Sequence, residues 1–162
     1  MNSLSGMLNS KWTLWAHLPH DTDWSLKSYI KIMNIETVDE IVALYKNIPD
    51  NMVKNCMLFM MRDGINPTWE DEKNKNGGCF SYKISNKCVV DVWKITTYMV
   101  TGETISNEQN VSLDVNGISI SPKKNFCIVK IWFSSCSNQN PKLIECNYGL
   151  SHNGCIFKKH IS

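Results

Sequence analysis

Two segments of the chain alternate between apolar and polar residues, and this pattern constrains the fold more than any other feature. The segment Cys79–Ile84 alternates cleanly, and Phe126–Phe133 alternates in the same way across Trp132. A period of two predicts strands with one buried face. Strands and helices do not follow each other regularly enough to build a parallel sheet. We therefore predict an α+β fold in which helices pack on one face of a single antiparallel sheet.

Other elements follow from local signals. Further strands are expected at Lys11–Leu18, Ser28–Met33, Cys56–Met61, Val111–Val115, Gly117–Ser121 and Leu143–Asn147, and a polar tail is expected after the last of these. The sequence Thr37–Glu40 is a capping box and predicts a helix that Pro49 ends. A second helix is expected from about Asn86 or Lys87 to Thr101, with Gly102 as its terminator.

The length of 162 residues suits one domain. Residues 1–10 lack periodicity and predict a flexible arm, so residues 11–162 form the predicted domain. We find no apolar run of membrane-spanning length and no signal-peptide pattern, which favours a cytosolic or nuclear protein, and we expect it in the cytoplasm. The seven cysteines are scattered without the close pairing of a zinc site, so we expect reduced thiols and neither a metal nor a cofactor.

The formal net charge of +2 is too small to predict general nucleic-acid binding. If RNA is the ligand, its recognition must be local. Arg62 is the only arginine, so contacts to phosphate must come mainly from lysine side chains.

The stretch Pro67–Gly78 places Trp69 beside Glu70 in a segment too charged to be buried. An exposed indole offers a stacking surface, and the neighbouring carboxylate accepts two hydrogen bonds. Together they suit the Watson–Crick edge of guanine, and a methyl group at N7 adds a positive charge that strengthens stacking. Trp24 lies in a similar polar loop, His20–Ser25, and is expected to be exposed as well.

Three other tryptophans lie in predicted strands. Trp12 and Trp15 are expected in the core because the segment around them is apolar. The alternation around Trp132 is compatible both with an inward core residue and with a ligand contact, and the pattern leaves this open.

The chain resembles the eukaryotic translation initiation factor 4E family, the messenger RNA cap-binding proteins. The resemblance rests on segments in matching order: Lys11–Trp15, Trp24, Thr37–Glu40, Ala43–Tyr45, Asp63–Ile65, Pro67–Gly78, Trp93, Gly102–Glu103, Ile131–Trp132, Pro141–Ile144 and Ser151–His152. It implies a curved sheet with helices on the convex face and a ligand slot on the concave side. It also implies a monomer that binds capped messenger RNA, acts in translation initiation and is not an enzyme.

The resemblance assigns roles to individual residues. Trp24 and Trp69 would sandwich the 7-methylguanine, Glu70 would accept hydrogen bonds from its N1–H and 2-amino groups, and Trp132 would lie near the methyl group. Cys79 stands where the family usually has an arginine, and Ser121 lies near a second arginine position. Positive charge near the phosphates could come instead from Lys123, Lys124 and Lys130, although these could equally be ordinary surface lysines.

The predicted partner-binding face also departs from the family. A helix-surface tryptophan usually anchors a helix of the scaffold factor 4G, but the matching residue here is Val42. Val38 is retained, while Lys94 and Tyr98 stand in a groove that is usually rich in leucine. The family's long helix between the last two strands is replaced by the short segment Ser134–Asn140. Scaffold binding is therefore expected to be weak, or a different partner has taken its place.

Alternative functions remain open from the sequence. A hydrolase using Cys79 and His152 lacks a supporting motif. A partner-binding module that has lost cap binding is disfavoured because Trp24, Trp69 and Glu70 are all present. A cap-sequestering competitor cannot be distinguished by sequence from a productive initiation factor.

Overall fold

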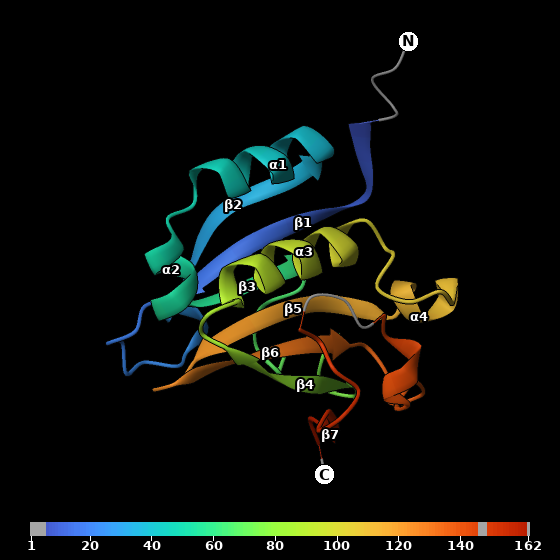
Figure 1. Cartoon of the computed structure of the whole chain (residues 1–162). Coiled ribbons are helices and arrows are strands. Elements are labelled where there is room, and N and C mark those ends of the chain that lie inside the picture. Colours follow the sequence, from blue (N-terminus) through green and yellow to red (C-terminus); the bar gives the residue numbers. More distant parts are fainter. Residues whose placement is uncertain (1–5, 146–148, 162) are drawn as a thin grey trace.

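A single antiparallel sheet forms the frame of the molecule. The structure is a computed structural model and describes residues 6–145 and 149–161 (Figure 1). In these residues the strands are arranged in the order β2-β1-β3-β5-β6-β4-β7. They are β1 (Met7–His17), β2 (Tyr29–Thr37), β3 (Met57–Arg62), β4 (Gly78–Ser85), β5 (Val115–Pro122), β6 (Phe126–Phe133) and β7 (Ile156–Lys159). The predicted antiparallel α+β fold is confirmed.

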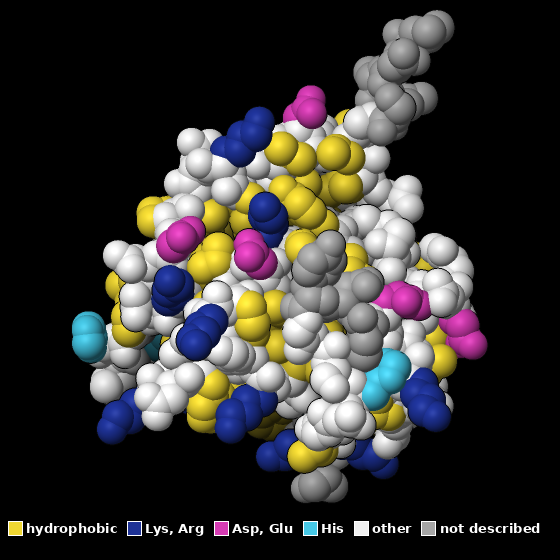
Figure 2. Space-filling model, viewed as in Figure 1, with side chains coloured by type: hydrophobic (Ala, Val, Ile, Leu, Met, Phe, Trp, Pro, Cys, Tyr) yellow, Lys and Arg dark blue, Asp and Glu magenta, His cyan; other side chains and the backbone are white. Residues whose placement is uncertain are grey.

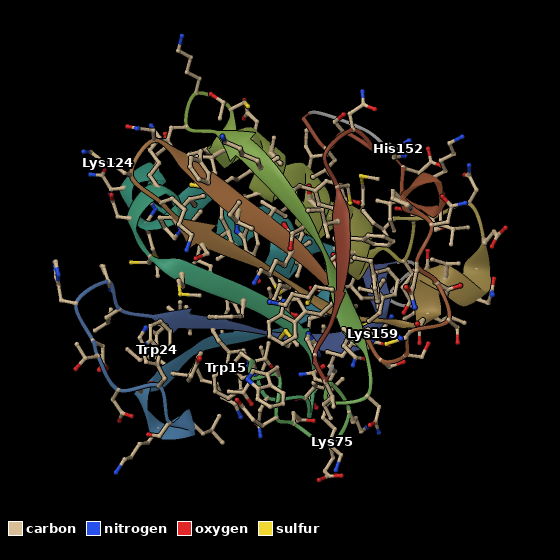
Figure 3. All side chains as sticks on the ribbon, turned by 90° about the horizontal axis from the view of Figure 1, so that it is seen from below. Trp15, Trp24, Lys75, Lys124, His152 and Lys159 are labelled. Atoms are coloured by element: carbon tan, nitrogen blue, oxygen red, sulfur yellow. The ribbon has the colours of Figure 1, made fainter. Side chains whose placement is uncertain are left out.

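Helices cover one face of the curved sheet, as Figures 1 and 3 show from two directions. They are α1 (Val38–Asn47), α2 (Asp50–Asn55), α3 (Val89–Thr101) and α4 (Gln109–Leu113), with 3₁₀ turns η2 (Leu26–Ser28) and η3 (Pro141–Leu143). The predicted capping box is confirmed, because Thr37 Oγ1 accepts a hydrogen bond from the backbone N–H of Glu40 and the Glu40 carboxylate accepts one from the N–H of Thr37.

Alternation along the strands separates a large core from a smaller cluster. Trp12, Phe80 and Tyr82 lie in the main core beneath the helices, as does Trp93 of α3. On the opposite face, which we call the ligand face, a second buried cluster contains Trp15, Phe59, Met61, Ile65, Cys79 and Trp132. Trp12 is thus confirmed in the core, whereas Trp15 is buried in the cluster of the ligand face.

The Arg62 side chain makes contacts that stabilise the fold. Its guanidinium forms an ion pair with the buried Glu103 carboxylate at 2.7 Å. It also donates hydrogen bonds to the backbone carbonyls of Val115 and Ser112 and to Ser10 Oγ. The sole arginine of the chain therefore joins β1, β3 and the start of β5 to Glu103 and to α4.

Several sequence predictions about local structure were wrong. Residues 7–10, predicted as part of a flexible arm, belong to β1. The predicted strand Val111–Val115 mostly forms α4, and only its last residue starts β5. The segment alternates apolar and polar residues as a strand does, but Val111 and Val115 are also four residues apart, as on one face of a helix, so five residues could not decide between the two.

The C-terminal predictions also need correction. Where the strand Leu143–Asn147 was expected, Leu143 ends η3 and residues 146–147 lie outside the described residues. The expected polar tail instead contains β7, which pairs with β4 through the partners Cys79↔Lys158 and Phe80↔Phe157. Backbone pairing to β4 holds β7 in the sheet.

No helix in the part of the chain that the structure describes is both long and apolar enough to cross a membrane.

Candidate functional site

Two adjoining pockets open on the ligand face. The first, which we call the base slot, has a volume of about 260 Å³ and is lined by Trp24, Tyr29, Met57, Phe59, Pro67, Thr68, Trp69, Glu70 and Trp132. The second, which we call the lysine pocket, has a volume of about 280 Å³ and is lined by Trp69, Cys79, Ser81, Lys130, Trp132, Lys158, Lys159 and His160. Trp69 and Trp132 line both, so the two pockets share a boundary.

Trp24 reaches the base slot from the loop between β1 and β2. One face of its indole stacks on the His17 ring, with centroids 3.9 Å apart and planes 1° apart. His17 Nε2 also lies 2.8 Å from the Asp23 carbonyl oxygen, which fixes the loop. Hydrogen bonds from the Ser25 backbone N–H and hydroxyl lower the pKa of the Asp23 carboxyl. The indole remains 57% exposed, as the polar surroundings predicted.

Trp69 stands on a loop whose order depends on polar contacts. Its side chain is 47% exposed. The fully buried Asn74 amide donates hydrogen bonds to the carbonyl oxygens of Asn66 and Thr68, and its own oxygen accepts one from Asn116 Nδ2. These contacts explain how a charged segment presents an exposed aromatic ring in a fixed place.

The loop ends in two glycines because the backbone passes very close to its neighbours. A Cβ added at Gly77 would lie 1.8 Å from the Phe133 carbonyl oxygen, and one at Gly78 would lie 2.4 Å from the Lys158 carbonyl oxygen. No side chain fits at either position.

Glu70 and Trp132 complete the base slot. Glu70 is exposed and follows Trp69 directly. Burial of the Tyr29 hydroxyl raises its pKa, and the negative charge of Glu70 raises it further. Trp132 is 7% exposed, and its Nε1–H donates a hydrogen bond to Ser119 Oγ at 3.0 Å. Trp132 belongs to the buried cluster and also lines both pockets. It therefore matches both interpretations that the sequence left open, an inward core residue and a residue placed to contact a ligand.

The predicted phosphate-binding lysines are not brought together. Lys130 lines the lysine pocket, whereas Lys123 and Lys124 are exposed at the turn between β5 and β6 and line neither pocket (Figure 3). In their place β7 contributes Lys158 and Lys159, which the sequence analysis missed.

A signal for β7 does exist in the sequence. The dipeptide Asn153-Gly154 is a strong turn signal, and the apolar pair Ile156-Phe157 follows it. Together they could have predicted a last strand beside the site.

Cys79 lies against a histidine, but not the one considered in the sequence analysis. Its Sγ is 3.1 Å from His160 Nε2, and His160 Nδ1 is 2.7 Å from the Asn74 carbonyl oxygen. Burial raises the pKa of the Cys79 thiol to about 12. His152 instead contacts the Ile144 carbonyl oxygen. The structure therefore supplies no thiolate nucleophile at this position.

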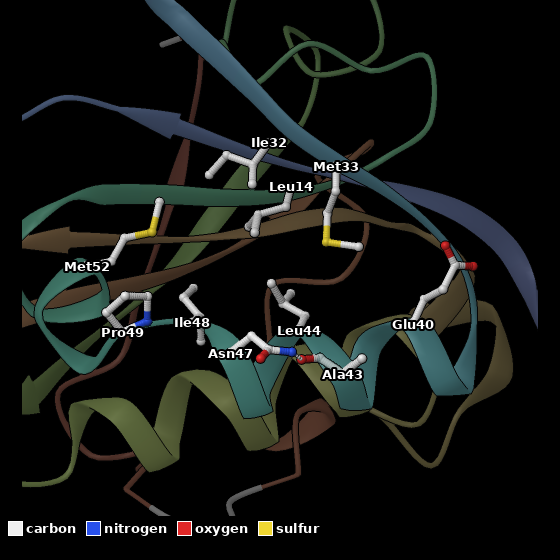
Figure 4. Close-up of a pocket in the computed structure, with 10 residues that line it drawn as sticks. All are labelled: Leu14, Ile32, Met33, Glu40, Ala43, Leu44, Asn47, Ile48, Pro49 and Met52. Carbon is white, nitrogen blue, oxygen red and sulfur yellow. Dashed lines mark hydrogen bonds between the residues drawn. The ribbon is translucent and has the colours of Figure 1, made fainter.

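The helix-covered side carries two apolar hollows. One, of about 160 Å³, is lined by Leu8, Val38, Ile41, Val42, Tyr98, Thr101 and Gly102. It unites three of the four residues predicted for the partner face, while Lys94 does not line it. The other, of about 410 Å³, lies between α1 and β2 and includes Ile32 and Met52 (Figure 4).

Comparison with known proteins places this geometry in a family. The family model described as Eukaryotic initiation factor 4E matches residues 7–147. The chain belongs to this family. It is 32% identical over 149 residues to eukaryotic translation initiation factor 4E of Candida albicans, covering 85% of this chain and 68% of that protein.

Two further relatives extend the comparison. The eukaryotic translation initiation factor 4E homolog of Acanthamoeba polyphaga mimivirus is 44% identical over 92 residues, covering 57% of this chain and 34% of that protein. The crystal structure of Ascaris suum eIF4E-3 with m7G cap has the same fold, with a TM-score of 0.72 and 19% identity over 82% of this chain and 76% of that one. The chain thus spans about two thirds of the yeast relative and about one third of the viral one.

Proposed function

We propose that this protein binds the 7-methylguanosine cap of messenger RNA and acts in translation initiation. The observation that carries the proposal is the base slot, where Trp24 and Trp69 come from separate loops to one cavity together with Glu70. Membership of the initiation factor 4E family supports the same function.

The base slot has the chemistry to recognise a methylated guanine. Trp24 has one face on His17, which leaves its other face for the ligand. Each stacked base contributes about 1–3 kcal/mol, and the positive charge of the methylated ring adds about 0.5–2 kcal/mol. Glu70 would accept the N1–H and 2-amino hydrogen bonds, which adenine cannot donate in this arrangement.

The phosphates of the cap fit the lysine pocket. Cys79 has replaced the family's arginine, but Lys158 is its cross-strand neighbour on β7 and restores a positive charge there. Lys130 and Lys159 line the same pocket. Lysines act as point charges toward phosphate, so binding should weaken as salt rises.

A helical partner segment is proposed for the hollow formed by Val38, Val42 and Tyr98. The hollow is small and apolar and lies on the helix-covered side, opposite the base slot. An aromatic anchor is often worth 2 kcal/mol or more, so the valine at position 42 predicts weak binding of a scaffold of the factor 4G type. Val42→Trp should strengthen capture of such a scaffold helix in a pull-down.

Retention on immobilised 7-methyl-GTP tests the cap-binding proposal. The protein should be retained and should elute with free 7-methyl-GTP but not with the same concentration of GTP. Elution by both nucleotides alike would contradict the methyl-specific base slot and would favour a partner-binding module that has lost cap binding.

Adding the protein to a cap-dependent translation extract would then separate a productive factor, which stimulates translation, from a cap-sequestering competitor, which inhibits it.

A further inference from the structure

Although the net charge is small, the charged side chains are distributed unevenly over the sheet. Within the described residues, strands β4 to β7 and the turn between β5 and β6 contain no aspartate or glutamate. The same segments carry six lysines: Lys83, Lys123, Lys124, Lys130, Lys158 and Lys159. Figure 2 shows dark blue side chains and no magenta ones along the lower rim of the molecule, over β7. This half of the sheet therefore presents positive charge without compensation.

Strand register arranges these lysines in successive rows on the ligand face. In the row nearest the base slot, Lys158 pairs with Cys79, which pairs with Trp132. In the next row Lys130 pairs with Ser81. Each row is two residues, or about 7 Å, from the one before it.

The third row continues in the same direction. There Lys83 pairs with Ile128, and the turn that carries Lys123 and Lys124 lies beyond it (Figure 3). We call the line from Lys158 through Lys130 and Lys83 to this turn the lysine track.

The far end of the lysine track also carries a partly accessible aromatic ring, that of Phe126. Phe126 is half-buried. It lies six residues before Trp132 on β6, an even number, so both side chains point to the ligand face. Lys83 Nζ lies 4.5 Å from the centroid of its ring. Lysines interleaved with an aromatic ring are typical of surfaces that bind single-stranded nucleic acid by its backbone and stack its bases.

We infer that the lysine track binds the RNA chain that follows the cap. This inference rests on the proposed function, because it begins where the phosphates leave the base slot. Six residues of β6, about 20 Å, separate Phe126 from Trp132, which places Lys123 and Lys124 beside later phosphates of the chain. The contacts are to phosphates and to one stacked base, so the track binds without sequence preference.

The triple variant Lys83→Gln with Lys123→Gln and Lys124→Gln tests this inference. It removes the far half of the track and leaves the base slot and the lysine pocket intact. The matched control is Lys46→Gln with Lys54→Gln and Lys94→Gln, which removes the same charge from α1, α2 and α3. The probes are 7-methyl-GTP, an unstructured capped RNA of ten nucleotides, and the same RNA without a cap, each at 50 and 200 mM salt.

Wild type and control should bind the capped RNA at least tenfold more tightly than 7-methyl-GTP at the lower salt. The triple variant should bind 7-methyl-GTP like the wild type and lose most of the additional affinity for RNA. Three lost phosphate contacts should reduce the slope of log K against log salt by about 2, so the fourfold rise in salt weakens wild-type RNA binding about 20-fold more than that of the variant.

The outcomes separate the inference from the proposed function. If 7-methyl-GTP binds with methyl preference but capped RNA binds no more tightly, the lysine track is overturned and cap binding stands. If the triple variant weakens 7-methyl-GTP as much as RNA, Lys123 and Lys124 hold the cap phosphates and the track is likewise overturned. If methyl preference is absent, but both RNAs bind the wild type more tightly than the triple variant, the proposed function fails and the track is supported.

Discussion

Trp24 and His17 lie face to face, with ring centroids 3.9 Å apart and planes 1° apart. The stack joins a loop residue to the end of β1, so one wall of the base slot is held in place by the sheet. A platform fixed in this way costs less conformational entropy when a ligand stacks on its other face.

Replacing His17 by alanine should therefore weaken cap binding. An aromatic pair contributes about 0.5–1.5 kcal/mol beyond its buried area, so 7-methyl-GTP affinity should fall about two- to tenfold. His17→Phe keeps the stacked ring and should retain most of the affinity. Isothermal titration calorimetry on both variants measures the difference. Tighter binding by His17→Ala would mean that the imidazole occupies the surface the ligand needs.

Trp69→Ala and Glu70→Ala should each weaken methyl-specific binding about 5- to 150-fold while leaving the fold intact. Both side chains are exposed, so the melting temperature should change by about 2 °C or less. Loss of one stacked surface costs about 1–3 kcal/mol, and loss of a charged hydrogen-bond acceptor costs a similar amount. Calorimetric melting beside ligand titration checks both statements. A drop of ten degrees in either variant would show that the loop is part of the structural core.

Asn74 should control the ligand site without touching the ligand. Replacing it by alanine removes the side-chain hydrogen bonds to the carbonyls of Asn66 and Thr68 and the one from the Asn116 amide, although the last two groups keep bonds to the Asp71 N–H and the Lys73 carbonyl. An unsatisfied buried polar group costs about 1–3 kcal/mol, so stability should fall by about 2 kcal/mol and the loop that carries Trp69 should loosen.

Hydrogen exchange of residues 66–77 together with 7-methyl-GTP titration measures the effect. Asn76→Ala changes an exposed residue of the same loop and serves as the control. Unchanged exchange in Asn74→Ala would show that other contacts hold the loop.

Cys79 should resist alkylation in the folded protein. Burial raises the pKa of its thiol to about 12, so about one molecule in ten thousand carries the reactive thiolate at pH 8. Because the folded pKa is raised, reactivity should appear only as the pH approaches that value. Iodoacetamide labelling followed by peptide mass spectrometry should find Cys79 modified in urea and protected in buffer. Rapid labelling in buffer would indicate a thiolate paired with protonated His160 and would reopen nucleophilic chemistry at this site.

The sequence predicted the parts of the fold that rest on strict periodicity or on local hydrogen bonds. The alternation of Cys79–Ile84 and Phe126–Phe133 corresponds to β4 and β6, and the Thr37 capping box starts α1. The segment Val111–Val115 was wrongly predicted as a strand because its three apolar residues alternate with Ser112 and Asp114, although Val111 and Val115 also have the four-residue spacing of a helix face.

The base slot and the lysine pocket differ in how far the sequence revealed them. Trp69 and Glu70 are adjacent in the chain, so their polar surroundings indicated an exposed pair. Lys158 and Lys130 come together only because β7 and β6 both pair with β4. Such a contact depends on strand order across the sheet, which local pattern does not encode.

The most direct test of the cap-binding proposal is a titration of intrinsic tryptophan fluorescence with 7-methyl-GTP, run beside GTP at fixed salt. Stacking of the methylated base on Trp24 and Trp69 should quench the emission saturably, at concentrations of 7-methyl-GTP at which GTP has little effect. The variant Trp69→Ala should lose most of this quenching. Equal quenching by the two nucleotides, or none by either, would contradict a methylguanine-binding slot between these two tryptophans.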